Sequence, residues 1–257
     1  MAYPPVFTLV NRFGQAITGV DTWPRPKATY HWKAGRSAME LARSWFRSGS
    51  VSCPRELQEL LASHTLTNAC DFLEGQPEFV TPLPQRGEGR NHDLWLRASC
   101  PAGPFTICVE AKADETFGDL VGEAVEKAQR RNPSTGLPVR VAALLELLFA
   151  QKCNPEDLPW RGFRYQLVTA FAGTAIQAAR DGSRTAVLVV QEFCGDHLDA
   201  ALQEQNDADL RYFLDSIAPA VGGFRPGLLV GPIVLRSNEY LSTNINLLVG
   251  KIKCQIP

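Results

Sequence analysis

Hydrophobic positions recur at helical spacing in several parts of the chain. From Ser37 onward, apolar residues fall at i, i+3, i+4, i+7 and i+8, which makes one apolar stripe along a helix. A second helix is predicted from Pro54 to His64, with the proline in its first turn. The segment 164–180 is apolar or small almost all round, as is typical of a helix packed closely on a sheet. Further helices are predicted at 119–131, 138–152 and about 198–217.

Strand patterns alternate with these helices. Residues 77–84 (PEFVTPLP) predict a short edge strand, because prolines are tolerated there and not in the interior of a sheet. Strands at 92–98 and 105–112 flank a Pro/Gly turn and form a hairpin. The apolar run 184–193 follows the helix 164–180, so this strand, helix and buried strand predict a right-handed parallel crossover. Two late strands are predicted at 227–235 and 244–253.

These elements predict an α/β (α+β) fold. Its central mixed β-sheet combines an antiparallel hairpin meander with a parallel crossover strand and is flanked by α-helices. The 257 residues are expected to form a single domain, 1–257. Within it, residues 1–50 form an N-terminal wrapping segment and a helix, 54–193 form the core, and 194–257 supply C-terminal helices and strands that complete the fold.

The side-chain alternation of the hairpin restricts its register. If Asp93 lies opposite Glu110, then Leu94 faces Val109 and one whole face of the hairpin is apolar. A slide of two residues, with Asp93 opposite Lys112, keeps the same faces, whereas a slip of one residue mixes them. Both allowed registers therefore bring Asp93, Glu110 and Lys112 to one face at one end of the hairpin.

This trio has the composition of a metal-dependent hydrolytic site. Two adjacent carboxylates repel each other unless one is protonated or a cation lies between them. Oxygen ligands favour a hard ion, so Asp93 and Glu110 indicate Mg²⁺ (or Mn²⁺) as the cofactor. Beside such an ion the pKa of Lys112 is expected to fall, which allows it to orient or deprotonate a water aimed at a phosphodiester. A solvated strand end with a Glu–Lys pair and an unrelated aspartate is the alternative.

Asp93, followed after 16 residues by Glu110-Ala111-Lys112 on a hairpin, resembles the PD-(D/E)xK nuclease superfamily, which has the restriction-endonuclease-like fold. The resemblance covers residues 54–193 in the order of their elements and makes them a nuclease-like core. It implies that Asp93 and Glu110 bind the divalent metal, that Ala111 offers its backbone carbonyl, and that Lys112 serves the attacking water. His92 stands where the family has a proline, and no separate DNA-binding module is evident.

The same resemblance suggests further candidates. Some members add a glutamate from the first helix or strand, and Glu78 is the candidate for that metal ligand. Others use a polar residue on the helix after the motif, and the first turn of a helix also favours a phosphate. The substrate-binding candidates are Arg90, His92, Arg164, Tyr165 and Gln166.

The implied function is divalent-metal-dependent hydrolysis of nucleic-acid phosphodiesters, with DNA as a more fitting substrate than RNA. The alternative is a catalytically inactive nuclease-fold protein with a binding or regulatory role, which the near-neutral net charge of -1 favours. A third interpretation makes Lys112 an amine nucleophile toward a carbonyl substrate. The sequence leaves a homodimer open.

The cysteine content and the hydropathy pattern indicate the location. Seven cysteines, an odd number without any CxxC spacing, suggest neither a disulfide framework nor a zinc site and favour a reducing cytoplasm. No run of about 18 apolar residues occurs, so no membrane span is expected, and the N-terminus lacks the pattern of a signal peptide.

Overall fold

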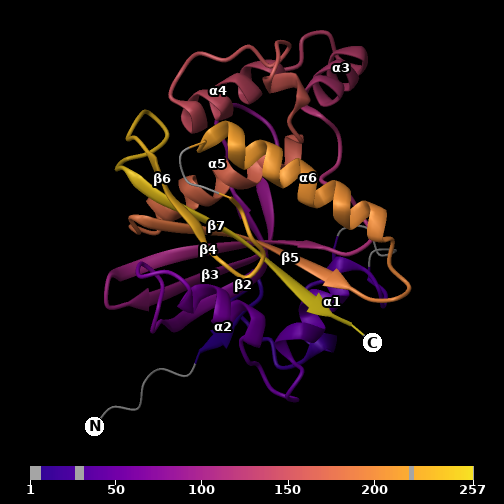
Figure 1. The fold of residues 1–257 in the computed structure, drawn as a ribbon, viewed down its shortest axis with the longest axis vertical. Coiled ribbons are helices and arrows are strands. Elements are labelled where there is room, and N and C mark those ends of the chain that lie inside the picture. The colour runs from indigo at the N-terminus through magenta and orange to yellow at the C-terminus, as the bar shows by residue number, and fades with distance from the viewer. Residues whose placement is uncertain (1–6, 27–31, 220–222, 257) are drawn as a thin grey trace.

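A seven-stranded mixed sheet with helices on both faces forms the centre of the protein (Figure 1). The structure is a computed structural model that describes residues 7–26, 32–219 and 223–256. The strand order is β1-β2-β3-β4-β5-β7-β6. This arrangement confirms the predicted α+β fold class with a mixed sheet flanked by helices.

Most elements lie within three residues of their predicted bounds. The strands are β1 (Thr8–Leu9), β2 (Asp71–Thr81), β3 (Arg90–Cys100), β4 (Gly103–Lys112), β5 (Thr185–Cys194), β6 (Val230–Leu235) and β7 (Ile245–Gln255). The helices are α1 (Ser37–Trp45), α2 (Arg55–Ala62), α3 (Val121–Arg131), α4 (Leu137–Phe149), α5 (Tyr165–Arg180) and α6 (Ala200–Ile217), with short 3₁₀ helices at Val20–Thr22 and Trp160–Gly162. No helix in these described segments is long and apolar enough to cross a membrane.

Strand β5 lies in the interior of the sheet. All ten of its residues are buried, which explains the continuous apolar run in its sequence. It pairs in parallel with β4 on one side and with β7 on the other. The chain between β4 and β5 contains α3, α4 and α5, and the two strands are parallel, so the predicted parallel crossover is confirmed.

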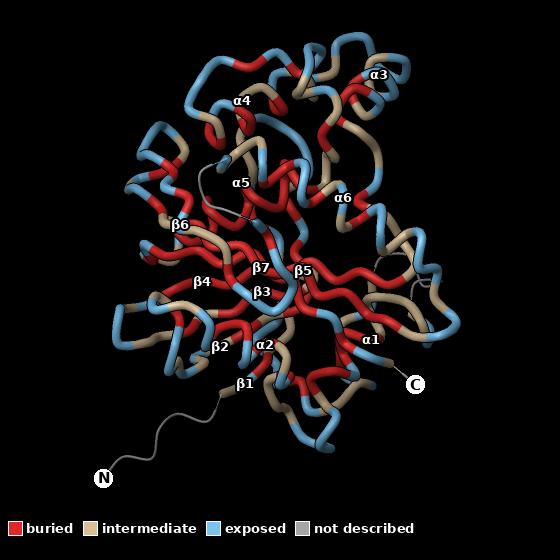
Figure 2. The backbone as a smooth tube through the Cα atoms, viewed as in Figure 1, coloured by how far each residue is buried: buried red, intermediate tan, exposed pale blue. Residues whose placement is uncertain are grey.

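The helices bury a hydrophobic core on each face of the sheet. On one face α1 and α2 pack with Trp45, Leu57 and Leu60 fully buried. On the other face α5 lies directly on the strands, with α4 and α6 packed beside it; Phe171 of α5 meets Phe213 of α6 with ring centroids 4.6 Å apart. Figure 2 shows the buried residues concentrated in the strands and in the helix surfaces that face them.

The hairpin β3–β4 has the first of the two predicted registers. Leu94 pairs with Val109 and Leu96 with Ile107, and these residues lie in the core beneath α1 and α2. Cys100 pairs with Gly103, so the turn is the two residues 101–102. The ladder stops at Leu94, however, and Asp93 and Glu110 are not ladder partners.

The N-terminal half of the sheet differs from the prediction. The strand expected at 77–84 begins six residues earlier, at Asp71, and ends at Thr81. An irregularity in pairing with β3 between Phe72 and Glu74 interrupts the alternation of side chains and hides the strand in the sequence.

The segment 1–50 also contains a short strand where none was predicted. Strand β1 pairs in parallel with Glu74 and Gly75 of β2. A Cβ atom on Gly75 would lie only 2.7 Å from Leu9 Cδ2, so the glycine lets the side chain of Leu9 pack closely on β2. Parts of the expected wrapping segment, residues 1–6 and 27–31, lie outside the described residues.

Candidate functional site

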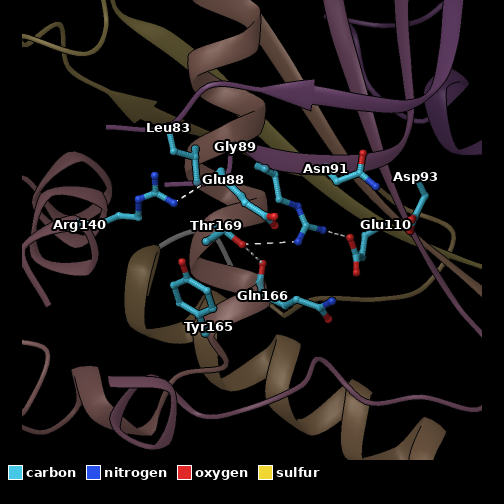
Figure 3. A pocket seen from close by; sticks show the side chains of 11 residues that line it. Leu83, Glu88, Gly89, Asn91, Asp93, Glu110, Arg140, Tyr165, Gln166 and Thr169 are labelled. Atoms are coloured by element: carbon cyan, nitrogen blue, oxygen red, sulfur yellow. Dashed lines mark hydrogen bonds and ion pairs between the residues drawn. The ribbon is translucent and has the colours of Figure 1, made fainter. Parts of the chain in front are cut away.

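A polar pocket of about 330 Å³ opens between the β3–β4 hairpin and the start of α5 (Figure 3). The side chains of Tyr165, Gln166 and Thr169 reach it from α5, and those of Asp93 and Glu110 reach it from the hairpin. Residues of the loop before β3, the first two residues of β3 and one residue of α4 complete the lining. These are Leu83, Glu88, Gly89, Arg90, Asn91 and Arg140.

Asp93 lies at the point where the two hairpin strands separate. Its Oδ2 accepts a hydrogen bond of 2.7 Å from the backbone N–H of Ala111. Burial raises the pKa of Asp93, while the charge of Lys112, the Ala111 N–H and the charge of Arg90 act in the opposite direction. One carboxylate oxygen is thus used to hold β4, and the other remains for the pocket.

Glu110 lies between two cations. Its Oε1 is 2.8 Å from the Nζ of Lys112, and its Oε2 accepts a hydrogen bond from the guanidinium of Arg90. All three side chains are buried, with exposed fractions of 5% for Glu110, 3% for Lys112 and 9% for Arg90. The predicted Glu–Lys pair is therefore a buried pair and not a solvated strand end.

Lys112 is held by several partners. Its Nζ donates a hydrogen bond of 2.9 Å to Oε1 of Gln166 and lies 5.2 Å from the centroid of the Phe117 ring. Burial lowers the pKa of Lys112 to about 8, against the charges of Glu115 and Asp93, which raise it. A lysine with this pKa can exchange a proton near neutral pH.

Three of the five predicted substrate-binding residues line the pocket, namely Arg90, Tyr165 and Gln166. His92 does not. It is buried, its Nε2 lies 3.1 Å from the hydroxyl of Thr81, and burial keeps its pKa well below the ordinary value. Arg164 also does not line the pocket, because its Nε binds Asp209 of α6 at 2.7 Å. The contacts of His92 and Arg164 hold elements of the fold together, and a substrate-binding role for either residue stays a prediction.

Glu78 lies near Asp93 but outside the pocket lining. Its Oε2 accepts a hydrogen bond of 2.6 Å from Asn91, and its backbone has a positive φ of 53°. Burial and the charge of Asp93 raise the pKa of Glu78 to about 7. The carboxylate of Glu78 thus lies close enough to Asp93 for their charges to interact. It does not contact Glu110.

Thr169, Glu115 and Arg140 are not among the predicted site residues; for Glu115 the sequence favours a solvated turn over an extension of the acidic site. Thr169 lies one turn after Gln166 on α5, so the helical period could have placed it beside that residue. Glu115 influences the pKa of Lys112 and accepts a hydrogen bond from Ser37 at the start of α1, a contact between segments far apart in sequence. Arg140 comes from α4, and no pattern in the sequence around it indicates that it reaches the pocket.

The oxygen donors of the pocket fit a hard divalent cation that keeps several waters. Asp93 and Glu110 line the pocket, and together with the backbone carbonyl of Ala111, which is not part of the lining, they are the expected ligands; such a set suits Mg²⁺ or Mn²⁺. Among the described residues, no three His, Cys, Asp or Glu side chains converge as a metal cluster. An ion held by Glu110 would have to share it with Arg90 and Lys112.

The fold and the pocket together define an α+β protein with a polar pocket at one end of an antiparallel hairpin, lined by Asp93 and Glu110, with Lys112 in contact with Glu110. The chain belongs to the family described as Domain of unknown function (DUF6946), which matches residues 16–255. Neither the curated proteins nor the solved structures gave a match to the chain.

Proposed function

We propose that this protein hydrolyses phosphodiester bonds of nucleic acid with the help of a divalent metal ion. The observation that carries the proposal is the contact of Lys112 with both Glu110 and Gln166 beside Asp93. Two carboxylates and a helix glutamine that line one pocket, and a buried lysine in contact with Glu110 and Gln166, are the groups that the resemblance to the PD-(D/E)xK nucleases implies. Their burial costs stability and is typical of groups placed for chemistry.

Each group has a distinct part in the proposed reaction. Asp93, Glu110 and the Ala111 carbonyl would hold Mg²⁺ or Mn²⁺, which when bound polarises a phosphate oxygen and lowers the pKa of water. Lys112 orients the attacking water and can accept its proton, because its pKa of about 8 leaves part of it neutral near neutral pH. Gln166 fixes the position of the Lys112 ammonium through its 2.9 Å hydrogen bond.

The lining of the pocket supports an anionic substrate. Arg90 supplies a guanidinium and Tyr165 a hydroxyl group, and both can donate hydrogen bonds to phosphate oxygens, whereas the hydroxyl of Thr169 already donates to the backbone carbonyl of Gln166 at 3.0 Å. We propose DNA as the substrate before RNA, following the resemblance. We also propose action in the cytoplasm, because all seven cysteines are unpaired.

The proposal is tested by incubating the protein with a pool of single-stranded, duplex and branched DNA and of RNA, with Mg²⁺ or Mn²⁺. Lys112→Met removes the amine and retains the aliphatic stem. Lys127→Met is the matched control, because Lys127 is exposed and pairs with Asp119 on the surface. Cleavage by the wild type and the control but not by Lys112→Met supports the proposal. Equal behaviour of all three proteins on every substrate would overturn it.

A second candidate is a nuclease-fold protein that binds nucleic acid without cleaving it. The observation that favours it is the guanidinium of Arg90 on Glu110, because this contact neutralises a proposed metal ligand. Calorimetric titration with Mn²⁺ separates the two candidates. A saturable site that Asp93→Asn abolishes supports the hydrolase, and nucleic-acid binding without any metal site supports the second candidate.

A further inference from the structure

Arg90 is a charged group of the pocket whose hydrogen-bonding capacity is incompletely used. Only 8% of the residue is exposed, so water does not solvate its guanidinium freely. Its Nε is buried without a hydrogen-bond partner, and its second contact besides Glu110 is a long one, 3.5 Å to the hydroxyl of Thr169. A guanidinium carries five N–H donors, so several donors remain unused.

Arg140, the other arginine of the pocket, is bound very differently. Its guanidinium donates to the backbone carbonyls of Pro84, Gln85 and Glu88, at 3.2, 3.2 and 2.6 Å. It therefore holds the loop that leads into β3. A guanidinium with three carbonyl acceptors is structural, whereas Arg90 faces a carboxylate and has donors to spare.

The stem of Arg90 is positioned by close packing on α5. Gly173 leaves room for it, since a Cβ atom at that position would lie 3.0 Å from Cγ of Arg90 and 3.1 Å from its Cβ. The stem is thus fixed, and the head group lies at Glu110 beside Asp93, whose charge acts on Arg90.

We propose that Arg90 is a resident counter-ion of Glu110 that competes with the divalent cation for this carboxylate. The inference rests on the proposed function, since it concerns the same site. A carboxylate oxygen that accepts a guanidinium hydrogen bond is less available as a metal ligand. When the cation takes Glu110, the guanidinium is released with its unused donors, and a phosphate oxygen of the substrate can accept them.

The competition is measured by titrating the folded, full-length protein with Mn²⁺ in a calorimeter. Arg90→Gln is expected to bind Mn²⁺ about tenfold more tightly than the wild type, within the range by which neighbours of ligands change metal affinity. Arg90→Lys keeps a positive charge and is expected to bind Mn²⁺ as weakly as the wild type. Arg97→Gln is the control, because Arg97 lies on the same strand in a surface pair with Glu74.

Wild-type protein supplies a second measurement that needs no substitution. The side-chain ¹H–¹⁵Nε resonance of Arg90 is expected to shift when Mg²⁺ is added, while that of Arg140 stays in place. An unmoved Arg90 resonance at Mg²⁺ saturation, or an Arg90→Gln protein that binds Mn²⁺ no more tightly than the wild type, overturns the assignment.

The failure of this inference differs from the failure of the proposed function. If the wild type binds Mn²⁺ and Arg90→Gln brings no gain, only the role of Arg90 is wrong. If neither protein binds Mn²⁺, the metal site itself is wrong, and the role of Arg90 falls with it. If Arg90→Gln binds Mn²⁺ and the wild type does not, Arg90 excludes the ion from Glu110 completely, which supports the competition.

Discussion

Asp93 of β3 and Ala111 of β4 are joined by a side chain-to-backbone hydrogen bond of 2.7 Å at the place where their strands separate. The bond replaces the next rung of the ladder, which ends at Leu94 and Val109. It turns the carboxylate of Asp93 toward the pocket and leaves one of its oxygens free. A single side chain therefore ends the hairpin pairing and forms part of the site.

This relationship predicts that Asp93→Asn unfolds no more readily than the wild type in metal-free buffer at pH 8. Asparagine can still accept the Ala111 N–H, and the substitution removes a buried charge. Burial raises the pKa of Asp93 in the folded protein above its value in the unfolded chain. At a pH above the unfolded-state pKa, ionisation of Asp93 therefore lowers the free energy of unfolding. Urea unfolding measures the difference, with the exposed Asp71→Asn on β2 as the control. A loss of more than about 1 kcal/mol in the free energy of unfolding of Asp93→Asn contradicts this explanation.

The hairpin and its trio could be predicted because a pattern of period two permits few registers. Leu94, Leu96, Val109 and Ile107 can share one face only in the registers allowed, so Asp93 is brought to the end of the hairpin next to β4. The alternation could not show that the ladder stops at Leu94. That detail depends on a single side-chain contact.

The rest of the site depends on contacts between distant segments. Arg140 reaches the pocket from α4 and binds carbonyls more than fifty residues earlier in the chain. The contact of Arg90 with Glu110 depends on how closely α5 approaches the sheet at Gly173. Local sequence carries no signal for either contact, because tertiary packing creates them.

Gly173 provides a prediction about that packing. An alanine there is expected to destabilise the protein by about 1–3 kcal/mol, because its Cβ would meet the stem of Arg90 and Cε1 of His92 at 3.0 to 3.3 Å. Thermal unfolding measures the change. Gly136→Ala at the start of α4 is the matched control, since a Cβ atom there meets nothing within 4 Å. Equal stability of the two variants would show that α5 does not lie so close to β3.

A buried ion cluster at the end of β5 and β7 predicts a pH dependence of stability. Lys251 is fully buried, lies 2.7 Å from Glu192 and also pairs with Asp207 of α6. Burial tends to raise the pKa of Asp207, but its hydrogen bond to Lys251 and the charges of Lys251 and Lys253 lower it overall. A lowered folded-state pKa contributes stability at neutral pH that is lost on acidification.

Asp207→Asn is therefore expected to lose about 1–2 kcal/mol of unfolding free energy at pH 7. The difference from the wild type should shrink as the pH falls through and below the ordinary aspartate value of about 3.9. Denaturant unfolding at several pH values measures it, with Asp215→Asn on the exposed side of α6 as the control. A difference that stays constant with pH would exclude the ionised Asp207–Lys251 pair as its cause.

The central claim is that Lys112 serves a hydrolytic reaction at this pocket. The most direct measurement is the single-turnover rate of cleavage of the most susceptible nucleic acid in the presence of Mg²⁺. We predict that Lys112→Met is slower than the wild type by about a hundredfold or more, while Lys127→Met cleaves at the wild-type rate. A Lys112→Met protein that cleaves as fast as the wild type would contradict the claim.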